Sequence, residues 1–364
     1  MEITRENVLK SLSKVEDPDL KKDLVSLNMI QNISIKDNQI SFTVVLTTPA
    51  CPLKELIRKN CEEAIQESFG TEISVSIEMS SSVTTIRNNT PILPGVKNII
   101  AISSGKGGVG KSTVAANLAV ALAKTGAEVG LIDADIFGPS VPTMFNCEFE
   151  QPSVTEQNGK NLIIPVQQYG VKLMSIGFLS PPENAVVWRG PMASSALKQF
   201  LGDTLWGDLD YLLIDLPPGT SDIHLTLVQT VPVTGAIVVT TPQKVALADA
   251  KKGLAMFKQP QINVPVLGVV ENMSYFTPEE LPDNKYYIFG ENGGKNLAEK
   301  FDVPFLGQIP IVQSIRESGD SGYPAVLKDD TSSEAFNNLS ESLAQQVAIR
   351  NATQHKTVKV ELNS

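Results

Sequence analysis

The sequence has few cysteines and a deficit of positive charge. Only three of its 364 residues are cysteines, Cys51, Cys61 and Cys147, so we expect no disulfide framework. No secretory signal is recognisable ahead of them, which favours a reducing cytoplasm as the location. Lys and Arg number 30 against 40 Asp and Glu, a net charge of −10, which disfavours a protein that binds nucleic acid by neutralising its phosphates.

Long hydrophobic runs are also missing. The apolar stretches at 114–123 and 235–241 fall short of the roughly 18 residues that a membrane-spanning helix needs, so we expect no membrane association. Hydrophobic residues make up 42% of the chain and charged residues 19%, which is typical of a soluble protein with a sizeable core. At roughly 150 residues per domain, the length indicates about two domains.

Residues 1–80 have the pattern of a small α+β domain. Apolar residues recur at helical spacing in 6–14 and 51–69, and short strands are expected at 33–35, 40–46 and 73–77. The next segment, 81–96, is rich in Ser, Thr, Asn and Pro without periodicity, and we interpret it as an interdomain linker.

From residue 97 onward, apolar strands alternate with helical patterns. This alternation predicts a doubly wound, mostly parallel α/β sheet covered on both faces, in a domain that spans 97–350, followed by a polar tail at 351–364. The expected strands are 98–103, 128–133, 171–176, 211–216, 235–240, 264–270 and 304–308. The expected helices are 112–124, 193–201, 245–258, 294–301 and 331–350.

A glycine-rich octamer follows the first of these strands and opens the first helix. Glycines let backbone N–H groups surround a phosphate, and the helix N-terminus adds a positive dipole end. Lys111 can reach the β- and γ-phosphates of a nucleotide, and the Ser112 hydroxyl can bind Mg²⁺. The nucleotide-binding residues expected here are Gly105, Lys106, Gly107, Gly108, Val109, Gly110, Lys111, Ser112 and Thr113.

The same glycines also satisfy a dinucleotide-binding pattern. Gly105, Gly107 and Gly110 fit G-x-G-x-x-G, and Asp133 lies 23 residues beyond Gly110, near the usual place of a ribose-binding acid. Two features favour the phosphate-binding loop instead. Lys-Ser follows the last glycine directly, and a second acid, Asp215, closes another apolar strand.

The second lysine of the loop, Lys106, carries a family resemblance. With it, the loop resembles that of the deviant-Walker-A ATPases, the MinD/ParA-like branch of P-loop proteins. The resemblance implies a homodimer in which Lys106 acts with Lys111 in catalysis by reaching the ATP of the other subunit, as an arginine finger does. It extends from about residue 97 to residue 350.

Other positions match the same family residue by residue. The resemblance implies that Asp135 positions the attacking water, that Asp215 holds Mg²⁺ through water, and that Asn272 bonds the adenine edge. Gly219 corresponds to the glycine near the γ-phosphate. A single Asp or Asn is more often a turn or helix cap. That alternative weakens here because the residues fall at carboxyl ends of apolar strands, where doubly wound sheets bind ligands.

Within this branch the sequence most resembles the Mrp/ApbC group of iron–sulfur cluster carriers. In the ATPase part the motifs are 135–140, 188–192, 216–225 and 271–275. Residues 17–20 and 46–52 resemble the SufT-like iron–sulfur maturation domain that is often fused to these carriers.

The sequence departs from that group at its cluster-binding motif. Members carry Cys-x-x-Cys after the Asn-Met-Ser-Tyr segment, one pair from each subunit holding a [4Fe–4S] cluster, but here residues 276–280 contain no cysteine. A four-cysteine site at that place is therefore excluded. The carboxylates that stand there, Glu279, Glu280 and Asp283, are hard ligands poorly matched to such a cluster, and we expect a solvated loop.

Cys51 is the best remaining thiol. It precedes Pro52 near an expected helix N-terminus, where the helix dipole favours a thiolate that can ligate iron. A cysteine with no chemistry at a helix end is an equal alternative. Cys61 is expected in the core and Cys147 in a structural role. We expect a surface or packing role for His224.

Three functions remain open. The leading one is a homodimeric carrier that slowly hydrolyses Mg·ATP and transfers a [4Fe–4S] cluster from assembly factors to apoprotein clients. The second is an ATP-driven adaptor in iron–sulfur assembly without a cluster of its own, which the missing Cys-x-x-Cys favours. The third is a positional ATPase of cell division or partition, but residues 331–350 contain one basic residue, Arg350, and lack the basic amphipathic helix expected of that class.

Overall fold

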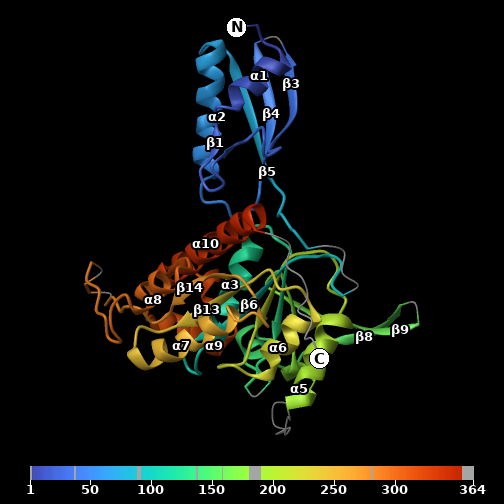
Figure 1. Cartoon of the computed structure of the whole chain (residues 1–364), viewed down its shortest axis with the longest axis vertical. Helices are drawn as coiled ribbons and strands as arrows, with labels where there is room; N and C mark the ends of the chain where they lie inside the picture. The colour runs from blue at the N-terminus through green and yellow to red at the C-terminus, as the bar shows by residue number, and fades with distance from the viewer. Residues whose placement is uncertain are drawn as a thin grey trace. The chain divides into compact units, whose positions relative to one another are not determined.

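The chain forms two compact units. The computed structural model describes residues 2–36, 38–87, 92–136, 138–157, 159–179, 190–278, 280–281 and 283–354. Residues 2–84 and Ala348–Gln354 make up the first unit, and Thr85–Val347 the second. The two units are considered separately below (Figure 1).

The N-terminal unit is a three-stranded sheet packed with two helices. Strand β3 runs antiparallel to β4, and β4 runs parallel to β5. Side chains of both helices and of β4 form one apolar core, which includes Leu12, Phe42 and Ile65. The elements are α1 (Arg5–Leu12), β1 (Glu16–Asp17), β2 (Lys22–Asp23), β3 (Ile30–Lys36), β4 (Gln39–Leu46), α2 (Lys54–Phe69) and β5 (Ser74–Ser81).

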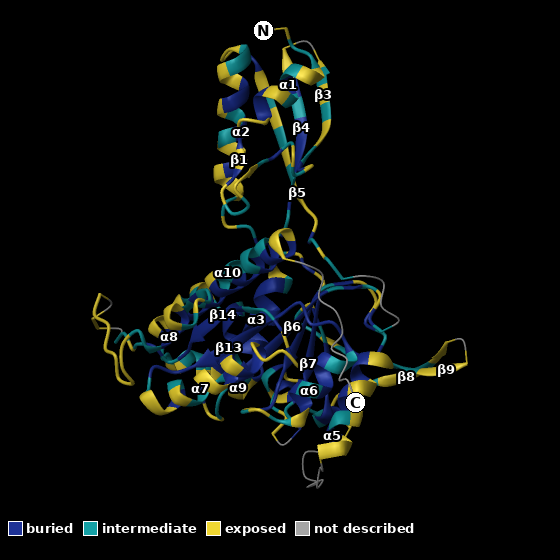
Figure 2. Cartoon of the chain, viewed as in Figure 1, coloured by how far each residue is buried: buried dark blue, intermediate teal, exposed yellow. Residues whose placement is uncertain are grey.

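An eight-stranded sheet organises the second unit. Its order is β10-β11-β7-β12-β6-β13-β14-β15, and every neighbouring pair is parallel except β10 with β11. Nearly all residues of the central strands are buried, as expected of a sheet covered on both faces (Figure 2). The strands are β6 (Val96–Ser104), β7 (Val129–Asp133), β10 (Val166–Gln168), β11 (Val171–Ser175), β12 (Leu209–Asp215), β13 (Gly235–Thr240), β14 (Val266–Glu271) and β15 (Phe305–Gln308).

Helices cover both faces of this sheet. Apolar residues of α5, α6, α7 and α8 share one core cluster with Ile99 and Ala101 of β6. Helix α3 contacts β7, β12 and β6 and carries α4 and η2 on its outer side. The helices are α3 (Lys111–Lys124), α4 (Val141–Met144), η1 (Ile176–Phe178), α5 (Gly190–Gly202), α6 (Asp222–Thr230), α7 (Lys244–Phe257), α8 (Gly293–Phe301), α9 (Gln313–Ser321), η2 (Ala325–Leu327) and α10 (Thr331–Thr353).

The strand order brings acidic residues to the glycine-rich loop. Strand β12 lies between β6 and β7, although it follows both in sequence. Asp215 at its end is therefore in register with Asp133 on one side and Ile102 on the other. Because parallel strands end at the same edge, the loop after β6 and the acids after β7 and β12 lie together.

The predicted doubly wound sheet and small α+β domain are confirmed, while several local expectations were wrong. Helix α2 begins at Lys54 instead of residue 51, because the residue before a proline, here Cys51, disfavours helical geometry. Helix α10 runs to Thr353, beyond the expected end at Arg350, and residues 355–364 of the expected tail lie outside the described residues. Not expected were α4, α9, η2, strand β10 and the hairpin of β8 (Ser153–Gln157) and β9 (Lys160–Ile164). Among the described helices, none combines the length and the apolar character that a membrane crossing requires.

Candidate active site

The loop between β6 and α3 has the backbone geometry that phosphate binding requires. Gly108 and Gly110 both adopt φ of 79°, a left-handed conformation that glycine enters without strain. Gly110 is the N-cap of α3 and offers no side chain, so the first N–H groups of the helix are left for a ligand. A Cβ at Gly110 would collide with the side-chain amide of Asn272, which gives this glycine a packing role as well.

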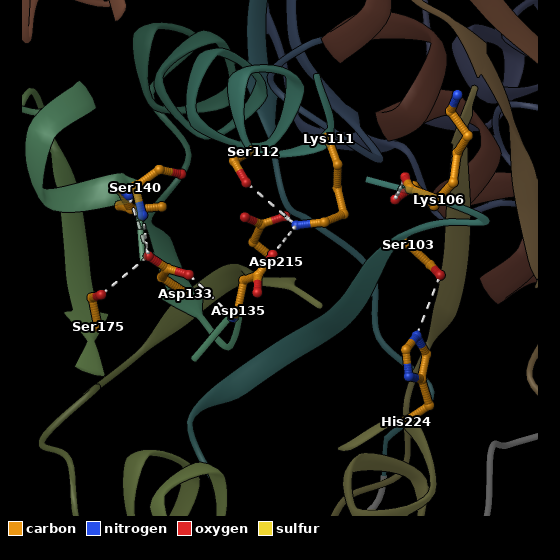
Figure 3. A network of polar contacts seen from close by, with 12 residues as sticks. Ser103, Lys106, Lys111, Ser112, Asp133, Asp135, Ser140, Ser175, Asp215 and His224 are labelled. Atoms are coloured by element: carbon orange, nitrogen blue, oxygen red, sulfur yellow. Dashed lines mark hydrogen bonds and ion pairs between the residues drawn. The ribbon is translucent and has the colours of Figure 1, made fainter. Parts of the chain in front are cut away.

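Lys111 joins the loop to the two acids expected to act with it. Its Nζ lies 2.6 Å from Asp215 Oδ1 and 3.7 Å from Asp135 Oδ2, and it donates to Ser112 Oγ at 3.3 Å (Figure 3). Lys111 is 5% exposed and Asp215 is fully buried. The structure therefore brings together four of the residues singled out from the sequence at the start of α3, with Ser112 and Asp135 partly exposed beside the buried Lys111–Asp215 pair.

Asp215 offers a carboxylate oxygen, the kind of ligand that a hydrated Mg²⁺ ion prefers. Its Oδ1 pairs with Lys111, whereas its Oδ2 is buried and accepts no hydrogen bond from any described residue. An unpaired buried carboxylate oxygen is unfavourable unless a ligand or water satisfies it. This oxygen and the hydroxyl of Ser112, which shares the Lys111 ammonium with Asp215, are the kind of oxygen ligands that a hard cation takes.

Asp133 makes a set of hydrogen bonds that the sequence did not predict. Its Oδ1 accepts the backbone N–H of Asp135 at 3.2 Å, and its Oδ2 accepts from Ser140 N at 3.1 Å, Val141 N at 3.2 Å and Ser175 Oγ at 3.1 Å. The carboxylate thus anchors the Asp135 loop and the start of α4. Burial and the nearby charge of Asp215 raise the pKa of Asp133 to about 7, although the bonds from Val141 and Ser175 and the charge of Lys111 lower it.

Lys106 is placed differently from Lys111. Figure 3 shows its side chain directed away from the Lys111–Asp215 pair. Its carbonyl accepts from Ser104 Oγ at 3.0 Å, but its ammonium makes no hydrogen bond or ion pair within the described part of the chain. The structure therefore does not bring Lys106 to the acids of its own site, and leaves its charge available to another molecule.

Asn272 follows strand β14, which is separated from β6 by β13, and its side chain reaches the loop. Its Nδ2 donates to the carbonyl oxygen of Val109 at 2.9 Å, and its backbone N–H donates to Thr240. The preceding residue, Glu271, is buried and accepts from Gly294 N and from Gln308 Nε2. These bonds fix the edge of the site on which the expected base-binding residue lies.

A cavity of about 220 Å³ follows the loop. Besides the expected loop residues and Asp135, its lining includes Ser104, Ser140, Met144 and Pro218, which were not expected. A larger cavity, of about 400 Å³, is lined by Ile176, Met192 and their neighbours without a charged side chain, so it does not suit a phosphate.

The three thiols differ in their burial. Cys61 and Cys147 are buried, and burial raises the pKa of each to about 12, as their expected structural roles imply. Cys51 is half-buried and packs against the core of the N-terminal unit. Within the described residues, no group of three or more His, Cys, Asp or Glu side chains is arranged to hold a metal ion.

The segment that replaces Cys-x-x-Cys is a solvent-exposed loop. Phe276 exchanges backbone hydrogen bonds with Tyr286, which closes the loop at its base. Glu280 and Asp283 are exposed, in agreement with the expected solvated loop, whereas Glu279 lies outside the described residues. Of the motif at 188–192, residues 188 and 189 also lie outside them.

Comparison with known proteins finds a matching family for each of the two units. The model of the ParA family, described as NUBPL iron-transfer P-loop NTPase, matches residues 95–348, and that of an iron–sulfur cluster assembly protein matches residues 5–77. The chain is 47% identical to an iron–sulfur cluster carrier protein of Synechocystis over 95% of this chain and 99% of the relative. It is 42% identical to the chloroplast Fe–S cluster assembly factor HCF101 of Arabidopsis thaliana, over 95% of this chain and 64% of that protein.

A solved structure shares the fold of the larger unit. It is a nucleotide-binding protein of Archaeoglobus fulgidus in complex with ADP, 40% identical, with a TM-score of 0.57 over 65% of this chain and 91% of that one. Family matches over most of the chain, a shared fold and the phosphate-loop geometry agree with one another. The chain therefore belongs to the iron–sulfur cluster carrier family of ParA-type, NUBPL-like P-loop NTPases.

Proposed function

We propose that this protein is a homodimeric ATPase that carries iron–sulfur clusters from assembly factors to apoproteins. The observation that carries the ATPase part is the buried Lys111–Asp215 pair with Asp135 beside it at the start of α3, below a loop that leaves the first N–H groups of the helix for a ligand. The cargo part rests on the family, since relatives at 42–47% identity are named as cluster carriers or assembly factors.

Each residue of the site has a separate role in the proposed hydrolysis. The loop N–H groups and Lys111 bind the phosphates, which separates the Lys111 ammonium from Asp215. Ser112 and Asp215, the latter through water, hold Mg²⁺, which neutralises charge on the β- and γ-phosphates when bound. Asp135 orients the attacking water, and Asn272 holds the base edge.

The position of Lys106 is an argument for the proposed dimer. Its ammonium has no acidic partner in its own subunit among the described residues and is directed away from the Lys111–Asp215 pair. A second copy facing the loop would supply a phosphate for it, and each subunit would then complete the site of the other. Hydrolysis would remove that bond and loosen the dimer, which suits a slow switch.

Cys51 is the proposed contact with the cluster. It is the one cysteine of the chain that is not fully buried. Two subunits offer two such thiols, fewer than the four that a [4Fe–4S] cluster takes. The bound cluster would therefore be labile, and a partner protein or a small thiol would supply the missing ligands. A labile site is consistent with transfer to clients.

A cluster-free adaptor is the second candidate, and the absence of any three-ligand group among the described residues favours it. Iron and acid-labile sulfide measured after anaerobic reconstitution separate the two functions. We expect a cluster on wild type that Cys51→Ser loses and Cys147→Ser keeps, because the Cys147 thiol is buried against Pro142 O. No cluster on wild type, with ATP hydrolysis intact, would instead establish the adaptor.

A further inference from the structure

A buried histidine lies behind the candidate active site. His224, in the first turn of α6, is 1% exposed and packs with its ring centroid 6.4 Å from that of Phe257 in α7. It does not line the cavity that follows the phosphate loop. Any influence of its imidazole on the reaction must therefore act through other residues.

One ring nitrogen closes the N-terminal cap of α6. Ser221 is the N-cap; its side chain accepts the backbone N–H of His224, and Nδ1 of His224 accepts the backbone N–H of Ser221 at 3.3 Å. This reciprocal pair is a capping box in which histidine takes the place that Glu or Gln usually fills. It fixes the direction in which the chain enters α6.

The other ring nitrogen reaches the strand that carries the phosphate loop. Nε2 of His224 lies 3.4 Å from Oγ of Ser103, the residue before the last of β6 (Figure 3). The next residue, Ser104, accepts the N–H of Gly219 at 2.8 Å, and its hydroxyl donates to the carbonyl of Lys106. The end of β6 is thereby bonded to both the phosphate loop and the turn before α6.

A neutral imidazole is suited to both bonds at once. Burial lowers the pKa of His224 to about 4, and the charge of Lys111 lowers it further against the bond to Ser221. A neutral ring has one N–H and one lone pair. Nδ1 also lies 3.2 Å from the carbonyl oxygen of Ser221, and the Ser103 hydroxyl can donate or accept, so the ring bridges Ser221 and Ser103 in either neutral tautomer.

We propose that His224 is a positioning residue for hydrolysis: it holds the turn of Pro218 and Gly219 against the end of β6. The proposal rests on the proposed ATPase function. Pro218 lines the cavity together with the phosphate loop, so the turn faces the bound phosphates. Releasing it changes the geometry around the terminal phosphate while the binding donors of the loop itself stay in place.

The test uses variants that remove the two bonds separately. His224→Leu removes both, His224→Gln keeps the cap because glutamine completes a capping box, and Ser103→Ala removes the strand bond alone. Ser318→Ala is the matched control, since its hydroxyl is equally buried and bonds no described residue. For each variant we would measure kcat and KM for ATP, nucleotide affinity and the melting temperature.

We expect kcat to fall about tenfold in His224→Leu and about threefold in His224→Gln and in Ser103→Ala, with nucleotide affinity unchanged. The double variant H224Q/S103A should be no slower than H224Q, because either change alone removes the same bond. Wild-type kcat in H224L, a loss of affinity equal to the loss of rate, or additive effects in the double variant would each overturn the proposal.

Hydrogen exchange separates this proposal from the ATPase function itself. Without nucleotide, the amides of Leu216, Gly219, Thr220 and Ser221 should exchange faster in H224L than in wild type, and the same amides in Ser318→Ala should not. If wild type hydrolyses no ATP, the proposed function fails while this measurement still decides whether His224 holds the turn. Unchanged exchange in H224L would exclude the positioning role.

Discussion

At the scale of single residues, the glycines of the phosphate loop differ in why they are needed. Gly105 lies against the backbone of Asp249 and Ala250 in α7, where a Cβ would overlap main-chain atoms. Gly107 has space instead, since the nearest atom to a Cβ there is Pro218 Cγ at 4.0 Å. The motif alone assigns both to phosphate binding, whereas the structure assigns Gly105 to the docking of α7.

This difference predicts unequal effects of one methyl group. Gly105→Ala should lower the free energy of unfolding by about 1–3 kcal/mol, because α7 must move to admit the Cβ. Gly107→Ala should change it by less than about 0.5 kcal/mol. Urea unfolding without nucleotide measures both, and equal stability of the two variants would contradict the packing role of Gly105.

Asp133 provides the second prediction at this scale. Asp133→Ala removes the shared acceptor of Asp135 N and Ser140 N, so both cavity-lining residues lose their anchor. We expect kcat for ATP to fall at least about tenfold. Ser175→Ala removes one of the four donors and keeps the anchor, so its kcat should stay within about threefold of wild type. Similar rates in the two variants would show that Asp133 does not position Asp135.

At the scale of elements, strands and their ends could be predicted, and short or polar elements could not. The apolar runs before Asp133, Asp215 and Asn272 predicted strands, and parallel packing then placed these residues at one edge. The four-residue helix α4 has too few residues for a periodic pattern, so the sequence showed no donors for Asp133. Whether a lysine points toward its own site, as Lys111 does, or away from it depends on packing that the sequence does not encode locally.

The cap of α6 gives a pH-dependent prediction. The pKa of His224 is 6.5 when unfolded and about 4 when folded, so between these values only the unfolded chain binds the proton. The contribution of His224 to the free energy of unfolding is therefore fully present above pH 6.5. It falls by about 3 kcal/mol in total as the pH decreases toward 4. His224→Gln has no such proton, so wild type should lose stability relative to H224Q between pH 7 and pH 5. If wild type and H224Q differ in unfolding free energy by the same amount at pH 7 and at pH 5, the buried neutral imidazole is contradicted.

At the scale of the whole molecule, the proposed homodimer requires that each subunit complete the site of the other. Each copy has an ordered Lys111–Asp215 pair and a Lys106 ammonium without a partner among the described residues. A site that takes Lys111 from its own chain and Lys106 from the other is incomplete in a monomer. The specific rate of hydrolysis should then rise with protein concentration until the dimer is saturated.

Mixing two inactive variants tests this arrangement directly. In Lys106→Ala and in Lys111→Ala homodimers, every site lacks one lysine, so each variant alone should be nearly inactive. In a mixed dimer, the subunit that keeps Lys111 receives Lys106 from its partner, which restores one of the two sites. An equal mixture should regain about a quarter of the wild-type rate, because half of the dimers are mixed and half of their sites are complete. Mixing with the double variant K106A/K111A is the control and should restore nothing. If the two single variants together stay as inactive as either alone, Lys106 does not act across the dimer.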